Sequence, residues 1–143
     1  MDVKHYRLEV RPSVIDRTGC FAGEAIPEGA VFREYTGELI SQAEALRREA
    51  DASRPAVYTL WLESGEVIDG WLGGNETIYL NHSCAPNCFL EEAEGRVYVG
   101  AERDIAAGEE LTIDYAYDAN TPLEPCRCGA AECRGYLNEV VNG

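Results

Sequence analysis

The sequence predicts a mainly β domain of many short strands, with one short helix. Short runs rich in Val, Ile, Leu, Tyr and Phe recur along the chain and are separated by Gly, Pro, Asn and Asp, which is the pattern of strands joined by turns. The 143 residues are about the length of one domain. A domain of this size buries enough surface to fold without disulfide bonds.

Five runs carry the strand signal. They are YRLEV (6–10), AVFREYTGELI (30–40), AVYTLWLESGEVIDG (56–70), RVYVGAERDI (96–105) and ELTIDYAY (110–117). Two further segments, IPEGAVF (26–32) and IAAGEEL (105–111), share an apolar-x-x-Gly-x-x-apolar pattern and predict turns that lead into strands. Two copies of a turn are too few for a repeat architecture.

One segment, SQAEALRREADAS (41–53), predicts the helix. Ser41 is suited to be the N-cap, and Glu44 follows three residues later, as in a capping box. Good helix formers continue until Arg54-Pro55, where proline ends the pattern.

The charge of the chain favours a basic partner. The 26 acidic residues outnumber the 12 basic ones, the net charge is -14, and Lys4 is the only lysine. Such a field repels nucleic acid and attracts cationic proteins or peptides, although acidity can also serve solubility alone. No run has the length of a signal peptide core or a membrane span, so we expect an intracellular protein whose six cysteines are thiols or metal ligands.

A cysteine cluster near the end of the sequence predicts a zinc site. The segment CRCGAAEC (126–133) places Cys126, Cys128 and Cys133 close enough to face one ion, and tetrahedral zinc takes a fourth ligand. The candidates for that ligand are Cys20, Cys84 and Cys88. The alternative is a set of free thiols.

Several motifs together resemble those of the SET-domain protein lysine methyltransferases with a post-SET zinc-binding loop, in a compact form that lacks a pre-SET region. In chain order they are EYTGE (34–38), GN (74–75), NHSCAPNC (81–88), GEELTIDYAY (108–117) and CRCGAAECRGYL (126–137). The resemblance implies the SET fold, a β-clip of several small sheets in which the ELTIDY segment threads beneath a loop near NHSC to form a knot-like active site. It also implies a SET domain over residues 1–121 and a post-SET zinc-binding segment over 122–143.

The resemblance implies S-adenosyl-L-methionine as cofactor. The residues that carry over as cofactor-binding are Thr18, Gly19, Cys20, Tyr58, Tyr79, Asn81, His82, Tyr136 and Leu137. The alternative for His82 is a core histidine without a ligand. Two positions depart from the family: Arg17 stands where the first glycine of a Gly-x-Gly turn is usual, and Ile78 stands where an arginine is common.

The implied reaction is methyl transfer to a lysine amine, which must be neutral to attack. Removing the proton at pH 7 costs about 4 to 5 kcal/mol, and an apolar channel next to a sulfonium reduces that cost. Tyr115 and Tyr35 match catalytic tyrosines of the family, and Ile113 and Tyr117 match the substrate channel. Because Ile113 replaces a tyrosine or phenylalanine that influences how many methyl groups are added, we expect more than one methylation.

For the structural zinc ion, the resemblance selects Cys84 as the fourth ligand beside Cys126, Cys128 and Cys133, and leaves Cys88 to pack as a small apolar residue. Trp61 and Trp71 are assigned to packing.

The substrate expected from these motifs is a basic protein, such as a histone tail or a basic ribosomal or nucleoid protein, whose peptide adds as a strand to an exposed edge. The setting is nuclear in a eukaryote and cytoplasmic in a bacterium. Two other interpretations keep part of the pattern. One is a SET-fold binding module with weak or no turnover, and the other is a zinc-stabilised structural protein without a cofactor.

Overall fold

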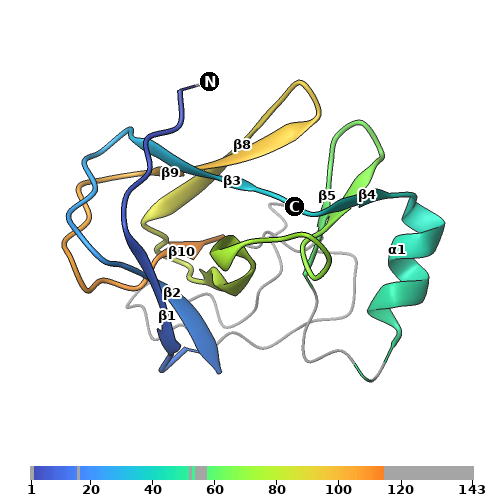
Figure 1. The fold of residues 1–143 in the computed structure, drawn as a ribbon, viewed down its shortest axis with the longest axis horizontal. Coiled ribbons are helices and arrows are strands. Elements are labelled where there is room, and N and C mark those ends of the chain that lie inside the picture. The colour runs from blue at the N-terminus through green and yellow to red at the C-terminus, as the bar shows by residue number, and fades with distance from the viewer. Residues whose placement is uncertain (1, 16, 52, 54–57, 115–143) are drawn as a thin grey trace, which may run out of the picture.

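The computed structural model describes residues 2–15, 17–51, 53 and 58–114. Over these residues the chain forms four small sheets, one α-helix and one 3-10 helix (Figure 1). The prediction of a mainly β fold with several small sheets and one short helix is confirmed. No helix among the described residues is long and apolar enough to cross a membrane.

The first sheet is an antiparallel hairpin of β1 (Leu8–Pro12) and β2 (Thr18–Ala22), in which Leu8 faces Ala22 and Pro12 faces Thr18. The run 6–10 anticipated β1. The sequence pattern missed β2, whose five residues TGCFA include a glycine and a cysteine and show little β-branched character.

The second sheet has the order β3-β9-β8, formed by β3 (Val31–Tyr35), β8 (Cys88–Ala93) and β9 (Arg96–Ala101), all antiparallel. Glu94 and Gly95 join β8 to β9 and both have positive φ, as a two-residue type I′ turn requires. The sequence pattern missed β8 because its outer half, EEA, is acidic and short of strand-forming residues.

The third sheet has the order β4-β6-β5, formed by β4 (Glu38–Ile40), β5 (Thr59–Trp61) and β6 (Val67–Asp69). Helix α1 (Gln42–Glu49) packs beside it (Figure 1). Ser41 is the N-cap and accepts a hydrogen bond from the Glu44 amide at 3.2 Å, as predicted. The helix ends four residues before the end of the segment 41–53, with Ala50 as C-cap.

The fourth sheet is the one that shapes the site. A 3-10 helix, η1 (Glu76–Tyr79), delivers the chain to β7 (Asn81–His82), and β7 pairs in parallel with β10 (Thr112–Ile113). Parallel pairing of such short strands brings NHSC and ELTID side by side, although about thirty residues separate them in sequence. The two predicted Gly turns, 26–32 and 105–111, meet through an antiparallel bridge between Ile26 and Ile105.

The main core lies between the hairpin, the second sheet and β10. Its largest fully buried side chains are Phe32, Ile26, Ile105 and Leu111. A smaller cluster of Tyr35, Leu62, Ile68 and Val97 lies between the second and third sheets. Leu80, which precedes β7, and Ile113, which pairs with it, belong to the main core, so the site residues of β7 are anchored next to that core.

Candidate functional site

The carboxamide of Asn81 is held in one orientation. Asn81 is 7% exposed, and its Nδ2 donates to Glu110 Oε2 at 2.9 Å and to the Thr18 carbonyl at 3.1 Å. Ser13 accepts from the same nitrogen at 3.2 Å, and its hydroxyl donates to Glu110 Oε1 at 2.7 Å. Since Nδ2 faces this acceptor group, Oδ1 faces the opposite direction.

Glycine at position 19 permits this arrangement. A Cβ on Gly19 would collide with the Glu110 carboxylate, so a side chain there would displace the group that orients Asn81. Thr18 and Gly19, both predicted to bind the cofactor, thus lie beside Asn81. Arg17 has a φ of 31°, in the left-handed region where glycine is preferred.

His82 is a buried link between β7, the end of β10 and Cys84. It is 3% exposed, its Nδ1 lies 3.5 Å from Asp114 Oδ1, and its Nε2 lies 3.4 Å from Cys84 Sγ. The Ser83 amide donates to the Ile113 carbonyl at 3.0 Å and continues the pairing of the two segments. The imidazole therefore organises the place where the two motif segments meet.

The three described cysteines differ in accessibility. Cys20 and Cys88 are 0% and 2% exposed, and burial raises the pKa of each thiol to about 12, so both stay protonated. Cys88 packs in the main core, as predicted. Cys84 is only partly buried. Among the described residues no group of three or more His, Cys, Asp or Glu side chains could hold a metal ion.

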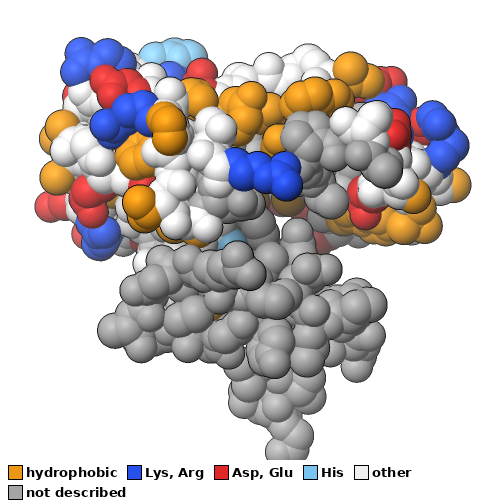
Figure 2. Space-filling model, turned by 90° about the horizontal axis from the view of Figure 1, so that it is seen from below, with side chains coloured by type: hydrophobic (Ala, Val, Ile, Leu, Met, Phe, Trp, Pro, Cys, Tyr) orange, Lys and Arg blue, Asp and Glu red, His pale blue; other side chains and the backbone are white. Residues whose placement is uncertain are grey.

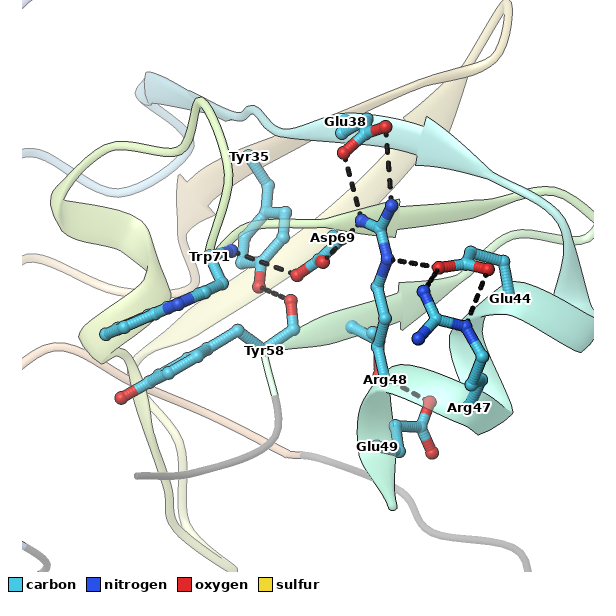
Figure 3. Close-up of polar contacts among 10 residues, drawn as sticks. Tyr35, Glu38, Glu44, Arg47, Arg48, Glu49, Tyr58, Asp69 and Trp71 are labelled. Carbon is cyan, nitrogen blue, oxygen red and sulfur yellow. Dashed lines mark hydrogen bonds and ion pairs between the residues drawn. The ribbon is translucent and has the colours of Figure 1, made fainter. Parts of the chain in front are cut away.

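Tyr58, Trp71 and Tyr79 form an aromatic group beside the third sheet, and Figure 3 draws Tyr58 and Trp71 of this group together with Tyr35. The Tyr35 hydroxyl donates to the Tyr58 carbonyl at 2.7 Å, and burial together with the Asp69 carboxylate raises the pKa of Tyr35, so it acts as a donor. The Tyr58 ring stacks on Trp71, with centroids 5.1 Å apart and an interplanar angle of 7°, and meets Tyr79 edge-on at 6.4 Å.

An ionic cluster lies behind this aromatic group. Asp69 is 0% exposed, and its two oxygens accept from the Trp71 amide at 3.1 Å and from Arg48 Nη1 at 2.9 Å. Arg48 also contacts Glu38 at 2.9 Å and Glu44 at 2.8 Å (Figure 3). Helix α1 is thereby tied to the strand end that carries Trp71.

A family model, described as SET domain, matches residues 17–116, which is more than half of the chain. The chain belongs to the SET domain family. It is 39% identical over 139 residues to "Histone-lysine N-methyltransferase, H3 lysine-4 specific" of Schizosaccharomyces pombe, with 92% of this chain and 15% of that protein covered. It is 40% identical over 126 residues to "Histone-lysine N-methyltransferase ASHR3" of Arabidopsis thaliana, with 83% and 25% covered.

The human "Histone-lysine N-methyltransferase 2D" is 35% identical over 134 residues, which cover 88% of this chain and 2% of that protein. The chain thus spans a quarter or less of the length of these three relatives.

The structure brings part of the predicted SET-domain site together. Asn81, His82 and Cys84 meet near β10. Tyr58 contacts both other predicted tyrosines, Tyr35 through its carbonyl and Tyr79 through its ring. Seven predicted residues lie outside the described residues: Tyr115, Tyr117, Cys126, Cys128, Cys133, Tyr136 and Leu137.

Two predicted residues lie in the main core. The Cys20 side chain is fully buried there, so only its main chain could approach a cofactor, and that main chain already pairs with β1. Ile113 is 7% exposed and belongs to the same cluster, so it could line only the buried inner end of a substrate channel.

Sequence reasoning missed the polar partners of Asn81 and the exposure of Trp71. Glu110 lies in the quoted motif GEEL, but only the fold shows that its carboxylate meets Asn81 and Ser13. Trp71 packs on Tyr58, which agrees with its assignment to packing, but it is also 42% exposed.

Proposed function

We propose that this SET domain is an S-adenosyl-L-methionine-dependent protein-lysine N-methyltransferase that acts on a basic protein. The observation that carries the proposal is the parallel pairing of β7 with β10, which places Asn81 and His82 beside the ELTID segment in a chain of this family. The names of the relatives, all histone-lysine methyltransferases, support the same reaction class.

The described residues fit the cofactor. The carboxamide of Asn81 is locked by Glu110, Ser13 and the Thr18 carbonyl, so it presents a fixed polar group to a ligand without reorganisation. Gly19 keeps β2 close to that group. S-adenosylmethionine would supply an activated methyl group. In this proposal Thr18, Gly19, Asn81 and His82 hold the cofactor, with Tyr136 and Leu137 completing the site.

Tyr35 fits the wall of a lysine channel. It is buried in the cluster with Leu62, Ile68 and Val97, and an ammonium beside such apolar side chains is poorly solvated, which lowers the pKa of a bound lysine and favours its neutral form. Tyr115 is proposed to orient the neutral amine, with Tyr35 as its partner and Tyr117 beside the channel. Catalysis by these groups is alignment and electrostatics, and water carries the proton away.

We also propose that Cys84, Cys126, Cys128 and Cys133 hold a structural zinc ion in a post-SET segment of residues 122–143, after a SET domain of residues 1–121. Cys84 suits the role because it is the described cysteine with solvent access, whereas Cys20 and Cys88 are buried as thiols. A closed site of four thiolates would order the segment that carries Tyr136.

The proposed substrate is histone H3 or another basic protein met in the nucleus of a eukaryote or the cytoplasm of a bacterium. All three relatives reported above are named for histones and one of them for H3, and the net charge of -14 favours a cationic peptide. Because Ile113 carries no hydroxyl, we propose that more than one methyl group is added.

The test is transfer of radiolabelled methyl from S-adenosylmethionine to a panel of core histones and basic bacterial proteins. The expected result is label on lysine that Tyr115→Phe abolishes. The matched control is Tyr98→Phe, which makes the same chemical change at a buried tyrosine of β9 that has no proposed role in the site. This variant should retain activity. Absence of label in the intact protein across the whole panel, with cofactor bound, would contradict the proposal.

That negative result would favour a second candidate, a SET-fold binding module without turnover. Arg17 is the observation behind it, because a bulky residue in the left-handed region stands where the family has a glycine near the cofactor. Cofactor affinity that rises in Arg17→Gly while methyl transfer stays absent would distinguish this module from the enzyme.

A further inference from the structure

Trp71 combines a large exposed area with a fixed position: it is 42% exposed, and its ring stacks on Tyr58. Apolar side chains are scattered over the described surface, as Figure 2 shows for one face. The large exposed ones among the described residues are Val10, Val14, Leu39, Leu46, Trp61, Trp71 and Leu72. Trp71 differs from the other six because its ring is stacked on another aromatic ring, that of Tyr58.

The two stacked rings are fixed from both sides by main-chain contacts. The Trp71 amide donates to buried Asp69, which Arg48 holds at 2.9 Å. The Tyr58 carbonyl accepts from the Tyr35 hydroxyl at 2.7 Å and from the Gly70 amide at 3.0 Å. Figure 3 shows both rings pointing away from the ionic cluster. A platform fixed in this way loses little conformational entropy when a ligand binds.

We propose that the Tyr58–Trp71 stack is a binding subsite for an arginine side chain of the protein substrate. The inference rests on the proposed function and deepens it, because it names a specificity-determining contact. Tyr58 also meets Tyr79 edge-on, and Tyr79 lies two residues before Asn81. The stack is thus joined through Tyr79 to the segment that carries Asn81, and through the Tyr58 carbonyl to Tyr35 of the proposed lysine channel. In this proposal the arginine flanks the lysine that enters that channel.

The chemistry selects arginine over an apolar residue or lysine. Indole gives the strongest cation–π attraction of the aromatic side chains, and a planar guanidinium stacks on it while its N–H groups stay in water. The net charge of -14 draws cationic segments to this domain and gives no comparable advantage to a neutral apolar one.

Binding to a histone H3 amino-terminal peptide tests the proposal without turnover. The chain has two tryptophans, so Trp61→Phe leaves Trp71 as the single tryptophan, whose emission can be excited apart from that of the eight tyrosines. We expect its emission to change on titration with the peptide and to change far less with the same peptide carrying citrulline, which is neutral, in place of arginine.

Matched substitutions then locate the contact. Trp61 is 44% exposed and Trp71 is 42% exposed, but Trp61 donates to Glu49 instead of stacking. Trp71→Leu should weaken binding of the arginine peptide by about 3- to 30-fold, the range of a cation–π contact, and leave binding of the citrulline peptide unchanged. Trp61→Leu should weaken neither. Trp71→Phe should bind the arginine peptide with an affinity between those of the intact protein and Trp71→Leu. It replaces Trp71→Leu in the test if the leucine variant does not fold.

Kinetics separate this subsite from the function it rests on. Trp71→Leu should raise KM for the arginine peptide with kcat and cofactor affinity unchanged, because a contact equal in ground and transition states affects binding alone. Equal effects of Trp71→Leu and Trp61→Leu, or equal binding of the two peptides, would overturn the subsite while methyl transfer stands. Peptide discrimination without methyl transfer would support the subsite and overturn the proposed enzyme.

Discussion

Replacing Asp69 by asparagine should destabilise the domain far more than the same kind of change at Glu38. Both carboxylates accept from Nη1 of Arg48 at 2.9 Å, yet the Asp69 side chain is 0% exposed and that of Glu38 is 47% exposed. Each substitution removes one negative charge that faces the Arg48 guanidinium. They differ mainly in burial, so they isolate its effect.

The magnitude follows from the contacts. In Asp69→Asn the new carboxamide can keep its oxygen for the Trp71 amide, but its NH2 group then faces the Arg48 donor, so a buried charge-assisted hydrogen bond is lost. Such bonds contribute about 1.5 to 3 kcal/mol. For a domain of this size a loss of about 2 kcal/mol lowers Tm by roughly 5 to 8 °C. Glu38→Gln breaks an exposed pair and should cost less than about 1 kcal/mol.

Urea unfolding of the three proteins, followed by circular dichroism, measures these free energies, and a thermal scan gives Tm. The m-value should be unchanged in both variants. Equal losses for Asp69→Asn and Glu38→Gln, or a gain in stability for Asp69→Asn, would refute the reasoning that burial decides what each carboxylate contributes.

Three further outcomes are expected. The Arg103 contact lowers the pKa of Glu109, so this carboxylate stabilises the fold above its ordinary pKa and loses that effect as pH falls through the lowered value. Glu109→Gln should therefore lower the stability at pH 7 and change it little at pH 2. Identical pH profiles of the two proteins in urea unfolding would contradict this. In the native protein without zinc, iodoacetamide should modify Cys84 and spare Cys88 until the chain unfolds, and peptide mass mapping measures both reactions. Equal rates of modification at the two cysteines would be inconsistent with the burial of Cys88. Glu110→Ala should weaken S-adenosylmethionine binding by about 10- to 100-fold through loss of the orienting bond to Asn81, and an unchanged calorimetric Kd in a folded variant would count against that role.

Local signals were the most predictable from the sequence. Ser41 and Glu44 are three residues apart, and their cap depends on the helix alone, so the local pattern was enough to predict where the helix begins. The same holds for the two glycine turns, where Gly29 and Gly108 adopt positive φ. The pairing of these turns through Ile26 and Ile105 was not predicted, because it depends on the path of the chain between them.

The candidate site was predictable only as a set of motifs. Asn81 and His82 were identified by resemblance, but the contact of Asn81 with Glu110 joins residues 29 apart and arises from the parallel pairing of β7 and β10. Likewise, nothing in the local pattern around Trp71 indicates Tyr58 as its neighbour. Motifs therefore indicated the chemistry, and the fold supplied the orienting groups.

The central claim is most directly tested by mass spectrometry of unmodified histone H3 incubated with the protein and S-adenosylmethionine. The account predicts that one lysine gains mass in steps of a methyl group, with species beyond the monomethyl product because Ile113 carries no hydroxyl. Unmodified H3, under conditions where calorimetry shows the cofactor bound, would contradict methyl transfer to H3, and a strictly monomethylated product would contradict the role given to Ile113.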